Sequence, residues 1–80
     1  MVVRGQRICT TLDFNGRLWK LTITRDFVLN LLVRRSISDS EFFDFIAREH
    51  GIIALLAKRK IIRMGLHGDS VLIDRYDLPA

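Results

Sequence analysis

The sequence has one cysteine, one proline and no long apolar run. Its longest uninterrupted apolar stretch, Ile52 to Ala57, is far shorter than the roughly 20 residues that a membrane-spanning helix needs, so we expect no membrane partner. Cys9 stands alone, so it can form neither an internal disulfide nor a CxxC metal or redox motif, which favours a reducing cytosol. No apolar stretch and no cleavage site follow Met1 to Gly5, so we expect no signal peptide.

The composition is that of a folded, mildly basic chain. Hydrophobic residues make up 49% of the 80 residues, which is enough for one domain, residues 1–80, that buries roughly two-thirds of its unfolded surface. Thirteen lysines and arginines oppose nine acidic residues, which gives a net charge of +4. A charge of this size favours solubility and weak attraction to polyanions, but it identifies no partner.

Asn15-Gly16 predicts a two-residue hairpin turn, because both central residues of a type I′ turn need a positive φ. Strands are expected from about Gln6 to Phe14 and from about Arg17 to Thr24. In this register one face of the hairpin is apolar, and a slip of one residue would expose that face. The expected core-facing pairs are Leu12/Trp19, Thr10/Leu21 and Ile8/Ile23. The expected open face carries Asp13, Thr11, Lys20, Cys9 and Thr22.

A first helix is predicted directly after the hairpin. Thr24 fits an N-cap whose hydroxyl accepts a backbone hydrogen bond, and Asp26 lies in the favourable first turn. Apolar residues recur at helical spacing from Phe27 to Leu32. We expect this helix to end near Arg34-Arg35, whose charges complement the negative helix terminus.

A second, longer helix is predicted after Ser38, which forms a capping-box pattern with Glu41. Its apolar stripe keeps its phase to about Lys60, which favours one continuous helix. Gly51 leaves open a division into two helices, although a glycine within a helix costs only about 1 kcal/mol relative to alanine.

The C-terminal part predicts one more strand. Ile61 to His67 fits either a fraying helix end or a short strand, Ser70 to Asp74 fits a strand, and Asp77 to Ala80 fits a fraying tail. The order β-β-α-α-β predicts a two-layer α+β fold, in which two helices cover one face of an antiparallel sheet of about three strands.

Basic residues gather at the two predicted helix ends. Nucleic-acid binding begins with phosphate neutralisation by such clusters. The same charges also complement a helix dipole, because the long helix opens with acidic residues and closes with basic ones. The only aromatic residue near a basic patch is Tyr76, beside Arg75, so base stacking is not favoured. The candidate polyanion contacts are Arg34, Arg35, Lys58, Arg59, Lys60 and Arg63.

Other candidate residues favour structural roles. His50 and His67 are seventeen residues apart without a third ligand at a matching spacing, so we expect no metal, and His50 fits a half-buried position. Cys9 is expected to be a structural thiol, and Trp19 is expected in the core rather than at an interface. Phe42 and Phe43 are adjacent on a helix and cannot both point inward equally, so one of them fits an exposed rim that, with an open sheet edge, favours self-association.

Three stretches resemble the small bacterial family called domain of unknown function 1488. They are Leu21 to Val28, the helical stretch Phe43 to Lys60 with Ile53 and Ala57 at signature positions, and Asp69 to Leu78. His50 stands where that family usually carries arginine. The resemblance implies a bacterial α+β domain, and because the family has no established activity it implies no catalytic residue or cofactor.

We therefore expect a small cytoplasmic bacterial protein that acts as a non-catalytic binding or accessory module, with an unknown partner or a second copy of itself. The alternative is binding of nucleic acid or another polyanion through the basic helix ends. An enzyme is the least supported class, because a helix-on-sheet domain this small rarely encloses a pocket with convergent polar groups.

Overall fold

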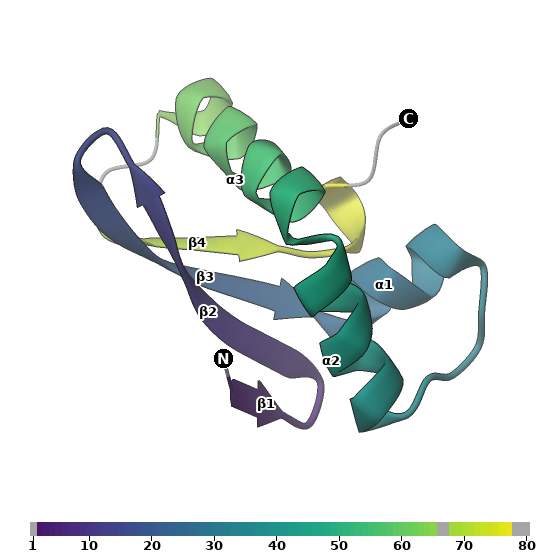
Figure 1. Cartoon of the computed structure of the whole chain (residues 1–80). Coiled ribbons are helices and arrows are strands. Elements are labelled where there is room, and N and C mark those ends of the chain that lie inside the picture. The colour runs from purple at the N-terminus through teal and green to yellow at the C-terminus, as the bar shows by residue number, and fades with distance from the viewer. Residues whose placement is uncertain (1, 66–67, 78–80) are drawn as a thin grey trace.

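The computed structural model describes residues 2–65 and 68–77 and has an α+β fold in which helices cover one face of a mixed sheet (Figure 1). The elements follow the order β-β-β-α-α-α-β, with a short 3-10 helix at the end of the described chain. Their bounds are β1 Val2–Arg4, β2 Arg7–Phe14, β3 Arg17–Thr24, α1 Arg25–Leu32, α2 Asp39–Arg48, α3 His50–Met64, β4 Ser70–Ile73 and η1 Arg75–Asp77.

The central hairpin confirms the predicted turn and register. Asn15 and Gly16 have φ values of 55° and 71°, as the type I′ turn requires. β2 and β3 pair from Phe14 opposite Arg17 to Arg7 opposite Thr24. Trp19 lies in the core as expected, although its indole N–H has no hydrogen-bond partner in the described structure.

The sheet differs from the prediction in its two outer strands. The four strands lie in the order β1-β2-β3-β4; β1 was not predicted, and it pairs antiparallel with β2. β4 pairs parallel with β3, so the expectation of a purely antiparallel sheet was wrong. The helices carry the chain back to the end where β3 begins, and the next strand must then run in the direction of β3 (Figure 1).

α1 begins where predicted but ends earlier. Thr24 is the N-cap residue, yet its hydroxyl makes no capping bond and instead donates to Asp26 and to the Ile73 carbonyl. The helix ends at Leu32, before Arg34-Arg35, because Val33 adopts the left-handed conformation with φ 54°.

The predicted long helix is two helices. The capping box is confirmed, with both the Ser38 hydroxyl to Glu41 N–H and the Glu41 carboxylate to Ser38 N–H distances at 3.1 Å. The expectation of one helix to Lys60 was wrong, because Glu49 (φ −103°, ψ 22°) bends the chain. The bend lies two residues before Gly51, and it lets α2 and α3 follow a twisted sheet. Ile61 to Met64, left open between helix and strand, belongs to α3.

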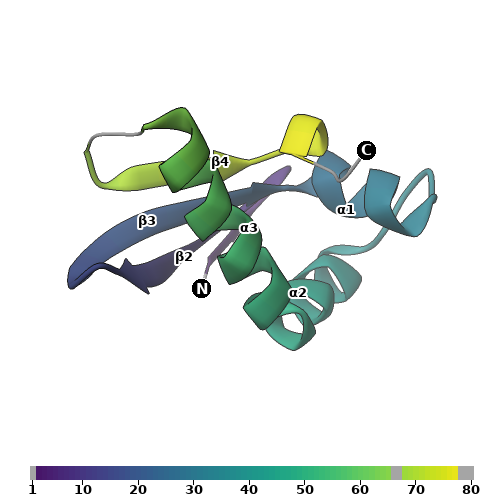
Figure 2. The same ribbon diagram turned by 90° about the horizontal axis from the view of Figure 1, so that it is seen from above.

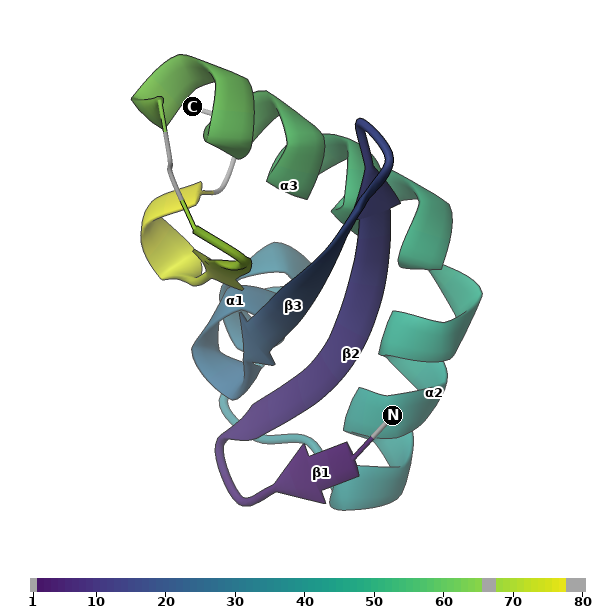
Figure 3. The same ribbon diagram turned by 90° about the vertical axis from the view of Figure 1, so that its left-hand side faces the viewer.

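The core lies between the sheet and the layer of α2 and α3, which Figures 2 and 3 show on one side of the strands. Its buried members include Ile8, Trp19 and Leu21 from the hairpin and Phe42 and Ile53 from the helices. The opposite face is open as predicted: Thr11 and Lys20 are exposed, and Cys9 lies 3.8 Å from the Thr22 hydroxyl. None of the described helices is both long and apolar enough to cross a membrane.

Candidate functional site

An apolar hollow lies between α1 and the junction of α2 with α3. Its volume is about 220 Å³, and six of its seven lining residues are apolar. The hollow is lined by Phe27, Leu31, Phe45, Glu49, Ile52, Ile53 and Leu56. Leu31 and Ile52 at its mouth are 43% and 59% exposed, so apolar surface here faces solvent.

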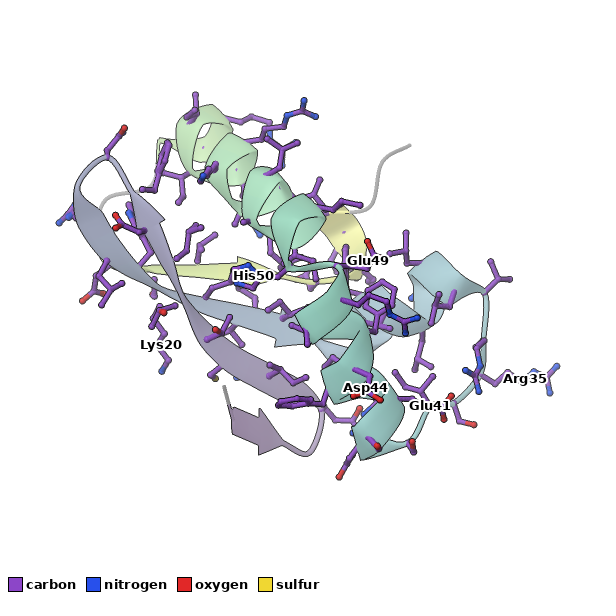
Figure 4. The ribbon with its side chains drawn as sticks, viewed as in Figure 1. Lys20, Arg35, Glu41, Asp44, Glu49 and His50 are labelled. Carbon is purple, nitrogen blue, oxygen red and sulfur yellow. The ribbon has the colours of Figure 1, made fainter. Side chains whose placement is uncertain are left out.

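The bend at Glu49 is what opens this hollow. On α1, Phe27 and Leu31 are four residues apart and so lie on one side of the helix. On the other wall, Phe45 lies in the last turn of α2, and Ile52 lies in the first turn of α3 beyond the bend. Glu49 lies at this junction on the side of α1 (Figure 4). A carboxylate therefore stands beside an otherwise apolar surface.

A charged groove continues from the hollow along α2. It is lined by Leu32, Arg34, Glu41, Asp44, Phe45, Arg48 and Glu49, so Phe45 and Glu49 belong to both hollow and groove. The Arg34 guanidinium donates to Glu41 at 2.7 Å. The backbone N–H of Ser38 and the Arg34 guanidinium lower the pKa of Glu41 to about 2, so Glu41 is ionised at neutral pH. Figure 4 shows Glu41, Asp44 and Glu49 in sequence toward the junction.

The size and lining of the hollow fit one side chain of a partner better than a small-molecule substrate. Ligand sites for drug-sized molecules measure roughly 300–1,000 Å³ and carry several convergent polar groups. This hollow is smaller, and Glu49 is its one ionisable lining residue. Apolar side chains anchored in such recesses dominate the energy of many protein interfaces.

The structure does not gather the predicted basic residues into one surface. Arg34 and Arg35 lie on the connection from α1 to α2, whereas the other four lie in the last two turns of α3. These two regions are at opposite ends of the molecule (Figures 1 and 4). The two groups cannot therefore contact one short stretch of phosphates together.

One α3 cation, Lys60, is engaged within the protein, and a second, Arg63, lies near the same carboxylate with its side chain 67% exposed. Lys60 Nζ donates to the Leu72 carbonyl at 2.5 Å and to Asp77 at 2.9 Å. Arg63 lies 3.8 Å from the same carboxylate. Asp77 is therefore part of the fold, and its predicted place in a fraying tail was wrong; residues 78–80 lie outside the described residues.

Among the described residues, His50 and Cys9 belong to no cluster of possible metal ligands. His50 is exposed at the start of α3, so its expected half-buried position was wrong (Figure 4). His67 lies outside the described residues. Across residues 2–65 and 68–77, no three His, Cys, Asp or Glu side chains are placed to hold a metal ion.

Sequence reasoning missed the hollow because it assigned Leu31 to a single core stripe. The available signal was an excess of apolar residues: α3 carries Ile52, Leu55 and Leu56 in addition to its buried stripe of Ile53, Ala57 and Ile61. A helix that is apolar on two sides must bury the second side or offer it to a partner.

No family model, no curated protein and no solved structure matches this chain.

Proposed function

We propose that the protein is a non-catalytic binding module that takes an apolar side chain of a protein partner into the hollow between α1, α2 and α3. The observation that supports this proposal most strongly is the combination of an apolar lining with exposed Leu31 and Ile52 at the mouth. The neighbouring charged groove supplies polar groups of both signs, as the rim of a protein interface does.

A cytoplasmic location, a bacterial origin and membership of the domain of unknown function 1488 family remain part of this proposal. They rest on the lone Cys9 and on the sequence stretches described above. The polyanion alternative has less support, because Arg35 is far from the α3 cations and Lys60 is already bonded to Asp77.

The test uses N-phenyl-1-naphthylamine, an uncharged dye that fluoresces in apolar sites. We expect saturable binding to the wild-type protein and a roughly tenfold weaker binding to Leu31→Lys, because tenfold corresponds to about 1.4 kcal/mol and a buried Leu contact supplies that much. Leu31 lies near the end of α1 and is partly exposed, so a lysine there leaves the fold intact.

The matched control is Leu18→Lys, which places the same substitution on the open face of the sheet, where Leu18 is 66% exposed. We expect this variant to bind the dye as the wild type does. Equal dye binding by both variants, or no saturable binding by the wild type, would count against the hollow as the binding site.

A further inference from the structure

We propose that the solvent-facing side of α3 is a self-association seam, on which α3 of a second copy packs antiparallel. The seam consists of Ile52, Leu55, Arg59 and Ile62. It adjoins the hollow but does not depend on it: only Ile52 belongs to both, and Leu56 lies at the boundary.

The spacing of the seam is that of a helix-pairing stripe. Its four residues follow one another at intervals of three, four and three, which is the a and d pattern of a coiled coil. Three of the four are apolar and exposed: Ile52 by 59%, Leu55 by 49% and Ile62 by 71%. The fourth, Arg59, has a long aliphatic stem that can cover a neighbouring apolar residue.

The seam is not part of the core of this chain. α3 buries Ile53, Ala57 and Ile61 against the sheet, each four residues from the next. At 100° per residue these three lie on the opposite side of the helix from Leu55 and Ile62. α3 thus has two apolar sides, of which the sheet covers one.

The charges beside the seam select a second copy in antiparallel orientation. Glu49, Leu56 and Arg63 are seven residues apart and flank the seam on one side. When two copies of α3 run antiparallel about a two-fold axis near Leu56, Glu49 of each copy meets Arg63 of the other.

In this antiparallel arrangement Ile52 faces Ile62 of the second copy, and Leu55 faces Arg59. A parallel pair would bring together the basic ends, with Lys58 near Arg63, and is disfavoured.

The length of the seam predicts a weak, reversible dimer. A stable interface buries about 800 Å² on each partner, and one face of two heptads covers less than that. The two Glu49–Arg63 pairs lie at the edge of this small interface, where ion pairs contribute little energy and mainly set orientation. Lys58, on the other flank, meets Lys58 of the second copy, so we expect Lys58→Gln to strengthen the dimer.

The test is sedimentation equilibrium of the full chain at concentrations from about 10 μM to 1 mM, a range that brackets weak association. We expect the apparent mass to rise from that of the 9.3 kDa monomer toward twice that value. Leu55→Lys and Ile62→Lys are expected to keep the mass at the monomer value, and Leu18→Lys is expected to dimerise as the wild type does. A monomeric mass at all concentrations would overturn the proposed seam. A loss of dimer in Leu18→Lys as large as that in Leu55→Lys and Ile62→Lys would overturn it as well.

Charge reversal and cross-linking test the orientation. Glu49→Arg alone and Arg63→Glu alone should weaken the dimer, and the double variant should restore it.

On a Cys9→Ser background, Ile52→Cys mixed with Ile62→Cys should form a disulfide faster than either variant does with itself. Faster self-linking of Ile52→Cys would contradict the antiparallel arrangement. A protein that stays monomeric and still binds the dye would overturn the dimer and leave the proposed function standing.

Discussion

At the scale of single residues, Arg25 connects more of the fold than any motif in the sequence indicates. It is buried, and its guanidinium donates 2.7 Å hydrogen bonds to the carbonyls of Ile37 and Gly5 and bonds the Asp39 carboxylate. It also stacks over Phe42 at 4.9 Å. One planar fork of donors thus joins the β1–β2 turn, the α1–α2 connection and the start of α2.

We expect Arg25→Met to lower the free energy of unfolding by about 2–4 kcal/mol, because it leaves the buried Ile37 carbonyl without a donor and removes the bonds to Gly5 and Asp39. Arg25→Lys should recover only part of this loss, since one ammonium cannot reproduce the fork. Urea unfolding followed by circular dichroism measures both effects. Arg35→Met is the control, because Arg35 is exposed, and its effect should stay within about 0.5 kcal/mol. A loss for Arg25→Met no larger than this control would refute the role of Arg25.

The bonds of Arg25 could not be predicted from the sequence. They reach residues 12 to 20 positions away, and local patterns report only neighbours within a few residues. Trp19 was different, because the turn register alone placed it opposite Leu12 on the buried face.

At the scale of elements, the Asn15-Gly16 turn fixes the longest strand pair. We expect Gly16→Val to destabilise the protein by about 1–3 kcal/mol, because a β-branched residue is strained at φ 71°. Asn15→Ala should have a smaller effect in the same direction, since asparagine tolerates positive φ better than alanine does. Thermal unfolding measures the change.

Gly51→Ala is the matched control for the turn. Gly51 lies within α3 without a positive φ, and a Cβ there meets no atom within 4 Å. Alanine at this position should therefore stabilise the protein by up to about 1 kcal/mol. Destabilisation by Gly51→Ala equal to that by Gly16→Val would show that the turn conformation is not the cause.

The Asp77 carboxylate connects η1 to Lys60 of α3, and we expect it to make the stability of the fold sensitive to acid. Burial raises the pKa of Asp77, but hydrogen bonds from the Asp74 N–H and the Lys60 ammonium outweigh it and lower the pKa below its ordinary value of 3.8. A lowered folded-state pKa means that this carboxylate stabilises the fold above about pH 3.8 and that the stabilisation is lost as the pH falls through the lowered value. The Asp77→Asn variant should be less stable than the wild type at pH 7, and this difference should shrink toward pH 2. A difference independent of pH between 7 and 2 in urea unfolding would contradict this role.

Prediction from the sequence succeeded where signals were local and failed where they were not. The turn, the Ser38–Glu41 capping box and the strand at β4 follow from adjacent residues. The parallel direction of β4 depends on where three helices lead the chain, and the bend at Glu49 depends on packing against the sheet. No residue in either segment signals these outcomes.

At the scale of the whole molecule, the helical side and the open sheet side differ in the surface that they expose. The hollow and the seam both lie on the helical side, and the candidate basic residues are divided between its two ends. The apolar content of the sequence was evident, but its division between core and surface could not be predicted without the positions of α1 and α3. Most of the large apolar side chains that are exposed in the described structure therefore lie on the helices or at their ends.

Methyl-detected nuclear magnetic resonance during titration with indole, which has the size of a tryptophan side chain, tests most directly whether the hollow binds an apolar side chain. Such binding should cause saturable shifts that are largest for the methyl groups of Leu31, Ile52, Ile53 and Leu56. Methyl groups of Leu18 and Leu72 on the open sheet face should not move. Shifts concentrated on Leu18 and Leu72, or no saturable shift at any methyl group, would contradict it.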